Sequence, residues 1–156
     1  MARPRKRSPE ESLELCLQEF WRRCYEATSI ADLCEALEVG PSSLYNAFGN
    51  KEQIYRQALE QYTERNSSFM KEALAIDDTA LALCTVLERA VEAYLDASCP
   101  GGCAVLAAST QEVELNAFLK RQRGRTLSAL ERRIRRGIKA GDLRADTTAA
   151  ERASFV

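Results

Sequence analysis

The chain has 156 residues, of which 46% are hydrophobic and 29% charged, and its formal net charge is −1. These values are ordinary for a soluble globular protein of one domain or two small ones. The chain contains no histidine, which excludes a Ser-His-Asp triad and removes the commonest general base and metal ligand. No apolar run approaches the roughly 18 residues that a membrane span needs, and no apolar signal segment follows the basic N-terminus, so we expect a cytoplasmic protein.

The charge is unevenly distributed although the total is near zero. Residues 1–7 carry four cations and no acid, residues 8–116 carry 19 acids and seven bases, and residues 117–144 carry ten bases and two acids. Basic stretches of this kind suit a polyanion. We interpret the first as a basic arm and the second as the solvated face of a long helix, whose apolar stripe is Leu127, Leu130, Ile134 and Ile138.

Almost every segment predicts helix, and no stretch alternates as a strand does. The first helix is expected over residues 9–23, since apolar side chains recur on one helical face at Leu13, Cys16, Leu17, Phe20, Trp21 and Cys24. Ser8 precedes Pro9, and Glu11 follows three residues after Ser8. This order predicts a capping box with proline at the first helical position.

Two short helices are expected next, the second beginning at Thr28 or Ser29 and the third at Pro41. Joined by a turn of about four residues, they form a helix-turn-helix. The third helix is predicted to turn Leu44 and Phe48 inward. Its other face carries small, hydroxyl or amide side chains, which can contact phosphates and base edges in a major groove: Ser42, Ser43, Tyr45 and Asn46.

After Gly49 and Asn50, a fourth helix is expected over about 51–66, with Ile54, Ala58, Leu59 and Tyr62 on its apolar stripe. The segment 146–156 predicts the start of another helix, capped by Asp146 or Thr147. We therefore expect an all-α protein. Residues 1–50, with the basic N-terminal arm, are expected to form a helix-turn-helix DNA-binding domain, and residues 51–156 a second helical domain.

The run YEATSIADLCEALEVGPSSLYNAFGNKEQIYRQAL, residues 25–59, resembles the DNA-binding domain of the tetracycline-repressor (TetR) family of bacterial transcriptional regulators. The matching features are TSI, VG followed by SLY, Phe48, and Lys51 with Glu52. GGCAVLAAS and GIKAGDLRAD resemble segments of the regulatory domain. The resemblance implies a homodimeric repressor that binds a palindromic operator in double-stranded DNA and is released by a small apolar or amphipathic effector.

The resemblance also implies which residues contact DNA. The basic arm would follow the minor groove, and Thr28 or Ser29 would meet a backbone phosphate. The exposed face of the third helix would enter the major groove, and Tyr45 and Lys51 would mainly hold phosphates. In full, the implied contacts are Arg3, Arg5, Lys6, Arg7, Thr28, Ser29, Ser42, Ser43, Tyr45, Asn46 and Lys51.

Two positions depart from the family pattern. The family usually has glycine where this chain has Cys24 and Glu38. Glycine is favoured where the backbone is left-handed, and another residue there costs roughly 1 kcal/mol. Either the local backbone differs or the strain is tolerated. A further departure concerns dimerisation, which in the family mostly uses two helices beyond the point where this sequence stops, so the C-terminal domain is expected to be incomplete and the dimer weak or rearranged.

The second domain offers an apolar stripe as a ligand pocket, although such spacing also suits plain core: Phe69, Met70, Leu87, Val91, Tyr94 and Leu106. Two alternative functions remain open. Cys99 and Cys103 enclose a Pro-Gly-Gly turn and suit a thiol-based redox sensor, and the helices suit a protein-interaction module without DNA binding. No enzyme is expected because these thiols lack a base, and no metal or other cofactor is expected.

Overall fold

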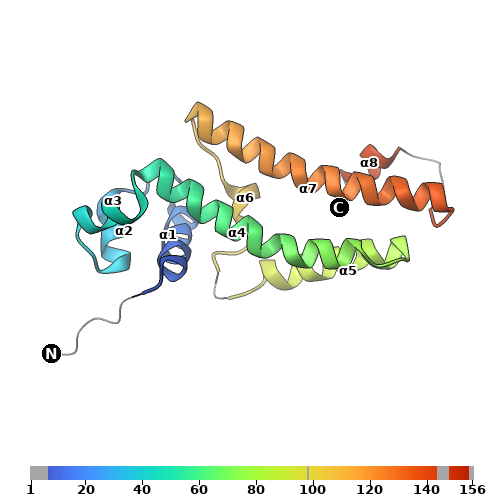
Figure 1. Cartoon of the computed structure of the whole chain (residues 1–156), viewed down its shortest axis with the longest axis horizontal. Helices are drawn as coiled ribbons and strands as arrows, with labels where there is room; N and C mark the ends of the chain where they lie inside the picture. The colour runs from blue at the N-terminus through green and yellow to red at the C-terminus, as the bar shows by residue number, and fades with distance from the viewer. Residues whose placement is uncertain (1–6, 98, 144–147, 155–156) are drawn as a thin grey trace. The chain divides into compact units, whose positions relative to one another are not determined.

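The computed structural model describes residues 7–97, 99–143 and 148–154, which form helices and no strand (Figure 1). The all-α fold class is confirmed. No helix within these described ranges is long and apolar enough to cross a membrane. The helices are α1 (Pro9–Arg23), α2 (Ile30–Leu37), α3 (Pro41–Phe48), α4 (Lys51–Leu74), α5 (Thr79–Tyr94), α6 (Ala104–Ala107), α7 (Val113–Ala140) and α8 (Ala149–Ala153).

The chain divides into two compact units. The first contains residues 1–64 and 103–116, and the second contains residues 65–102 and 117–156. The sequence-based boundary lies after residue 50, whereas internal contacts keep residues 51–64 and 103–116 with the N-terminal helices. The first unit therefore holds α1, α2, α3 and α6 together with the beginnings of α4 and α7.

Helix α1 begins with the predicted capping box. The Ser8 hydroxyl accepts from the Glu11 N–H at 3.1 Å, and the Glu11 carboxylate accepts from the Ser8 N–H at 2.8 Å. Most of the predicted apolar face is buried, but Trp21 is only half-buried and Cys24 is exposed. Trp21 instead packs edge-on against the Tyr62 ring of α4, with 5.7 Å between ring centroids.

Helix α4 is longer than predicted and reaches Leu74. Asn50 caps it, because its side-chain oxygen accepts from the Gln53 N–H and its own N–H donates to the Gln53 side chain, both at 2.9 Å. The predicted stripe is confirmed, and Tyr55 joins it among the buried residues of α4. The stripe packs this helix onto α1, where the Phe20 and Tyr55 rings lie 4.6 Å apart.

The second unit has its own apolar core, to which α4, α5, α7 and α8 contribute Ala73, Val86, Leu130, Ile134, Ala149 and Ala153. Leu130 and Ile134 confirm most of the predicted α7 stripe, but Leu127 is exposed. Thr148 caps α8 through a capping box with Glu151. The predicted caps Asp146 and Thr147 lie outside the described residues.

Arg133 is an exception to the solvated basic face of α7, because its side chain is buried. Its guanidinium donates to the carbonyl oxygens of Ile76 and Asp77, at 2.7 and 2.8 Å, and to the Thr79 hydroxyl. The Thr79 hydroxyl in turn donates to the Asp142 carboxylate at 2.9 Å. This network fastens the start of α5 to α7. It satisfies both terminal nitrogens of the buried cation, whereas the buried Arg133 Nε has no hydrogen-bond partner among the described residues.

Alanine substitutions at the two glycines of α7 are predicted to have opposite effects on the free energy of unfolding. A Cβ at Gly137 would collide with the buried Thr79 side chain, whereas a Cβ at Gly124 meets nothing within 4 Å. We expect Gly137→Ala to lower the free energy of unfolding by about 1–3 kcal/mol through overpacking. Gly124→Ala, the matched control, should raise it by about 0.5–1 kcal/mol because alanine favours helix. Urea denaturation measures both, and equal stabilisation by the two would contradict the packing.

Candidate nucleic-acid interface

Helix α3 buries Leu44 and partly buries Phe48, and it presents its other residues to solvent. Leu44 is 1% exposed, whereas Tyr45 is 46% exposed. Ser42, Ser43 and Asn46 are also exposed, and Phe48 is half-buried. The orientation predicted from the apolar pattern is thus present, with a small polar face directed outward.

The start of α3 adds hydrogen-bond donors to that face. Gly40 is the N-cap residue, and no side chain accepts from the first turn of this helix. The Ser43 N–H of this turn already donates to the Gly40 carbonyl at 3.0 Å, so the Ser42 N–H and the positive end of the helix dipole are the groups that favour an anion such as a phosphate. Pro41 occupies the first helical position, where its missing N–H costs no intrahelical hydrogen bond.

Lys51 begins α4, three residues after the end of α3, and is held by an aromatic cluster. Its ammonium nitrogen is 4.4 Å from the centroid of the Tyr25 ring. Tyr25 stacks on Tyr55 at 5.0 Å and on Phe20 at 5.8 Å between centroids. A cation over an aromatic face is attracted by the ring quadrupole, so Lys51 keeps a defined position at the beginning of α4.

The structure distinguishes Thr28 from Ser29, the two residues at the start of α2 that the sequence left as alternative phosphate contacts. Thr28 is buried, and its hydroxyl donates to the Cys24 carbonyl at 2.8 Å. The implied phosphate contact from Thr28 is therefore corrected, since its hydroxyl is turned into the protein. Ser29 is exposed and caps α2, accepting from the Asp32 N–H at 3.1 Å.

A carboxylate lies close to that cap. The Ser29 hydroxyl and backbone N–H both donate to Asp32, at 2.6 and 2.7 Å. Hydrogen bonds from the Ser29 side chain and backbone, with a smaller contribution from Arg23, hold the pKa of Asp32 below its ordinary value. Asp32 is thus ionised at neutral pH, and a phosphate at Ser29 would meet a negative charge.

Of the basic arm, only Arg7 lies within the described residues; Arg3, Arg5 and Lys6 lie outside them. The Arg7 guanidinium donates to the Leu37 carbonyl at 2.6 Å and approaches the Glu38 carboxylate at 3.5 Å. Both partners lie at the end of α2, in the turn before α3. The structure therefore places this arginine on the helix-turn-helix itself.

The two departures from the glycine pattern both have positive backbone φ angles. Cys24, which ends α1, has φ 66° and ψ 160°, and Glu38, which ends α2, has φ 58° and ψ 40°. Among the described non-glycine residues, these two have positive φ. The backbone is thus the one that glycine favours, and the chain tolerates the strain of a side chain at each position.

Glu26, in the loop after α1, is bonded to the segment between α6 and α7. Its carboxylate accepts from the Gln111 N–H at 2.9 Å. Partial burial raises the pKa of Glu26, but hydrogen bonds from Gln111 and the Thr110 hydroxyl, together with the charge of Lys51, outweigh this and lower it. The loop that leads into α7 is therefore attached beside the aromatic cluster and Lys51.

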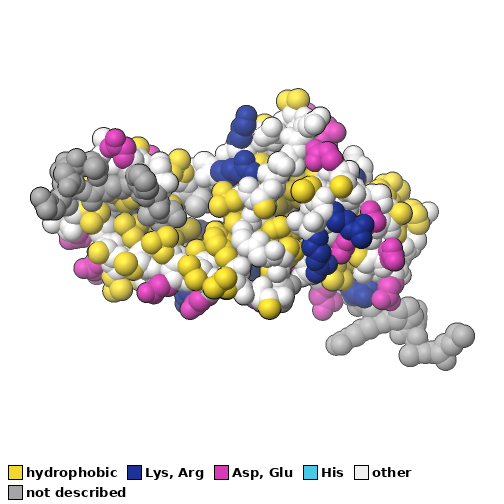
Figure 2. Space-filling model, turned by 180° about the vertical axis from the view of Figure 1, so that it is seen from behind, with side chains coloured by type: hydrophobic (Ala, Val, Ile, Leu, Met, Phe, Trp, Pro, Cys, Tyr) yellow, Lys and Arg dark blue, Asp and Glu magenta, His cyan; other side chains and the backbone are white. Residues whose placement is uncertain are grey.

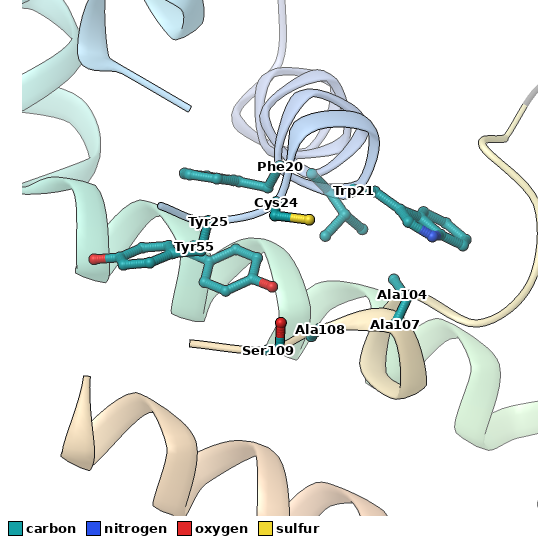
Figure 3. Close-up of a pocket in the computed structure, with 10 residues that line it drawn as sticks. Phe20, Trp21, Cys24, Tyr25, Tyr55, Ala104, Ala107, Ala108 and Ser109 are labelled. Carbon is teal, nitrogen blue, oxygen red and sulfur yellow. The ribbon is translucent and has the colours of Figure 1, made fainter. Parts of the chain in front are cut away.

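A small hollow lies between α1, α4 and α6 (Figure 3). The side chains of Phe20, Trp21, Cys24 and Tyr55 surround it on one side and alanines of the α6 region on the other. Its free volume of about 20 Å³ holds roughly one water molecule. It is too small for an effector of the expected kind.

The predicted effector pocket is not assembled from the six residues proposed for it. Leu87, Val91 and Tyr94 on α5 are exposed, and so is Leu106. Phe69 and Met70 are half-buried. Figure 2 shows apolar side chains gathered on the surface over α5. The pattern that suggested a pocket thus corresponds, in the second unit, to an open apolar surface.

All six cysteines are free thiols. Cys99 and Cys103 are partly exposed, Cys24 and Cys84 are exposed, and Cys16 and Cys34 are buried. Burial, with a contribution from neighbouring Cys34, raises the pKa of Cys16 to about 12. Within the described part of the chain, no group of three or more His, Cys, Asp or Glu side chains is arranged to hold a metal ion.

Comparison with known proteins places this geometry in a family. The sequence model of the bacterial regulatory proteins, TetR family, matches residues 13–58. The solved structure of a cysteine mutant of the TetR family transcriptional regulator CifR, complexed with 26-bp double-strand operator DNA, is 37% identical. The match has a TM-score of 0.84 and covers 98% of this chain and 83% of CifR. The chain belongs to the TetR family, which consists of transcriptional regulators rather than enzymes.

Two further relatives extend the comparison. The HTH-type transcriptional repressors ComR and BdcR of Escherichia coli K12 are each 30% identical, over 65% and 67% of this chain. This chain spans about half the length of these relatives, 49% and 53%. The structure of AibR with isovaleryl coenzyme A and operator DNA has the same fold at 17% identity, with a TM-score of 0.77 over 92% of this chain and 78% of AibR.

The cysteine environments predict a wide spread of reactivity. Only thiolate reacts with iodoacetamide, so at pH 7.5 a thiol of pKa about 12 reacts on the order of a thousandfold more slowly than an ordinary one. We expect Cys24 and Cys84 to be alkylated rapidly and Cys16 only after unfolding, as measured by peptide mass spectrometry. Rapid alkylation of Cys16 in the folded protein would contradict its burial.

The Glu26 contacts predict a pH-dependent contribution to stability. Because the folded-state pKa is lowered, the contribution is fully present above the ordinary glutamate pKa of about 4.3 and is lost as the pH falls through the folded value. At pH 7, Glu26→Gln should therefore lower the free energy of unfolding, by at most about 1 kcal/mol at this exposed site. The difference from wild type, measured by urea denaturation, should shrink below about pH 4, and a difference independent of pH would contradict this origin.

Proposed function

We propose that this chain is a DNA-binding transcriptional repressor whose helix α3 enters the major groove of an operator. The observation that carries the proposal is the orientation of α3, which buries Leu44 and leaves Ser42, Ser43, Tyr45 and Asn46 exposed. Short polar side chains allow a close approach, and their hydroxyl and amide groups match base edges. Relatives named as repressors and CifR in complex with operator DNA support the same function.

Phosphate contacts would come from groups around this face. The first turn of α3 supplies the Ser42 backbone N–H, Lys51 supplies a positioned cation, and Tyr45 supplies a phenolic hydroxyl. Contacts of this kind set the register of a protein on DNA, whereas the side chains that reach base edges select the sequence. Ser42, Ser43 and Asn46 are the candidates for selection in this division.

Regulation is proposed to follow the family pattern. A palindromic operator requires two copies of the chain, with their α3 helices separated by about one turn of DNA, near 34–36 Å. A small apolar or amphipathic effector would then act by favouring a different separation. AibR supports an acyl group as one such ligand, since its solved complex contains isovaleryl coenzyme A and operator DNA. Such a regulator would act in the cytoplasm, where bacterial DNA is located.

Selection of genomic fragments by the purified protein, followed by sequencing and gel shift, tests this function. We expect enriched fragments to share a palindrome and to bind more weakly as salt is raised, because bound counterions are released from the phosphates. Size-exclusion chromatography with light scattering, run with and without the selected duplex, determines how many copies bind. Enrichment of no sequence above background would reject the proposal.

The orientation of α3 makes a specific mutational prediction. Tyr45→Ala should weaken binding to the selected operator about tenfold and lower the magnitude of the salt slope by about one, as expected for one lost phosphate contact. Its free energy of unfolding should change little, because Tyr45 is exposed. Leu44→Ala is the contrasting variant and should lose about 2–5 kcal/mol of stability. Unfolding by Tyr45→Ala with operator affinity unchanged would show that the face is reversed.

A further inference from the structure

We propose that Arg7 is a positioning residue for the recognition helix, fastening the turn between α2 and α3 from outside rather than contacting DNA. The inference rests on the proposed function, since the turn matters only if α3 reads an operator. It differs from the role implied for the basic arm, in which Arg7 would lie in the minor groove with its neighbours.

Three hydrogen-bond donors satisfy backbone carbonyl oxygens at the end of α2, and Arg7 supplies one of them. The Glu38 N–H donates to the Glu35 carbonyl at 3.1 Å and the Val39 N–H to the Cys34 carbonyl at 3.0 Å. The Leu37 carbonyl accepts from the Arg7 guanidinium at 2.6 Å. The last carbonyls of a helix lack intrahelical partners and carry the negative end of its dipole, so a cation is favoured there.

The same guanidinium reaches the strained residue itself. Glu38 has φ 58° and ψ 40°, a left-handed conformation that resists a side chain. A second nitrogen of Arg7 lies 3.5 Å from the Glu38 carboxylate. The planar fork of arginine contacts the carbonyl and the carboxylate together, which the single ammonium group of lysine does less well.

The turn determines the direction in which α3 leaves α2. Val39 and Gly40 alone separate Glu38 from Pro41, where α3 begins. Helix α3 has eight residues, and Leu44 is its only buried side chain. The far end of α3 is tied to α4, because the Gln57 amide donates to the Phe48 carbonyl at 2.8 Å. The turn is the corresponding attachment at the near end, so relaxation of Glu38 toward an unstrained backbone would redirect the exposed face.

The contacts of Arg7 also make its side chain less available to bind a phosphate. Its side chain is 35% exposed and already donates to Leu37 and Glu38. To reach DNA it would have to release both partners and leave the Leu37 carbonyl without this donor. Substituting a residue that contacts DNA and substituting a residue that positions the turn therefore have different expected effects. They differ in the salt dependence of binding, in the sequence preference and in the amide exchange of the turn in the free protein.

Arg7→Ala tests the proposal, with Lys6→Ala, the neighbouring cation of the arm, as the matched control. In the free protein, Arg7→Ala should raise hydrogen-exchange rates of the Glu38 and Val39 amides on the order of tenfold, the loss expected for a charge-assisted hydrogen bond. Lys6→Ala should leave both rates unchanged. Equal rates in Arg7→Ala and wild type would overturn the proposal.

Binding separates the two roles further. Arg7→Ala should weaken binding to the selected operator about tenfold while changing affinity for mixed-sequence DNA no more than Lys6→Ala does, and should leave the salt slope at its wild-type value. A slope reduced by about one, with operator and mixed-sequence affinity falling together, is the signature of a lost phosphate contact and would overturn the proposal.

Arg7→Lys provides a second variant that keeps the charge. It should recover only part of the operator affinity and part of the exchange protection, because one ammonium group replaces a two-point contact. Full recovery of both would show that charge alone matters and would also overturn the proposal. If the wild-type protein selects no operator, the proposed function fails, whereas exchange at Glu38 and Val39 still tests the Arg7 contact in the free protein.

Discussion

The burial of Leu44 is the interaction on which the interface depends. Helix α3 is only eight residues long and is therefore unstable as an isolated helix. Its leucine, 1% exposed, decides which face meets the first unit and which face meets solvent. Side chains one position apart point about 100° apart on a helix, and Ser43 and Tyr45, on either side of the buried Leu44, are exposed. The polar face is thus a consequence of packing on the opposite side.

The ends of α1 and α2 show how surrounding side chains maintain a strained backbone. Cys24 and Glu38 keep backbone conformations that favour glycine. Thr28 bonds the carbonyl of Cys24 from inside the protein, and Arg7 bonds the carbonyl next to Glu38 from outside. The geometry of the helix-turn-helix is therefore maintained without the glycines expected at these points, through hydrogen bonds from side chains distant or nearby in sequence.

Residues 103–116 connect the first unit to α7. They include the first residues of α7 and belong by their internal contacts to the first unit. Its Gln111 N–H is bonded to Glu26, whose carboxylate lies within the electrostatic reach of Lys51. A conformational change at the start of α7 would thus alter the surroundings of Lys51, a proposed phosphate contact. An interaction that differs between two states in this way is what coupling between two sites requires.

The sequence by itself determined the first three helices, the cap at Ser8 and the outward face of α3, because helical periodicity and capping depend on residues within four positions of one another. Only the tertiary structure decided the inward turn of Thr28, the attachment of Arg7 to Leu37, and the bond between Glu26 and Gln111. It also showed Leu87 and Val91 exposed on α5. These outcomes depend on which segments meet in space, and an apolar or charged side chain has the same local pattern whether its partner is core, backbone or solvent.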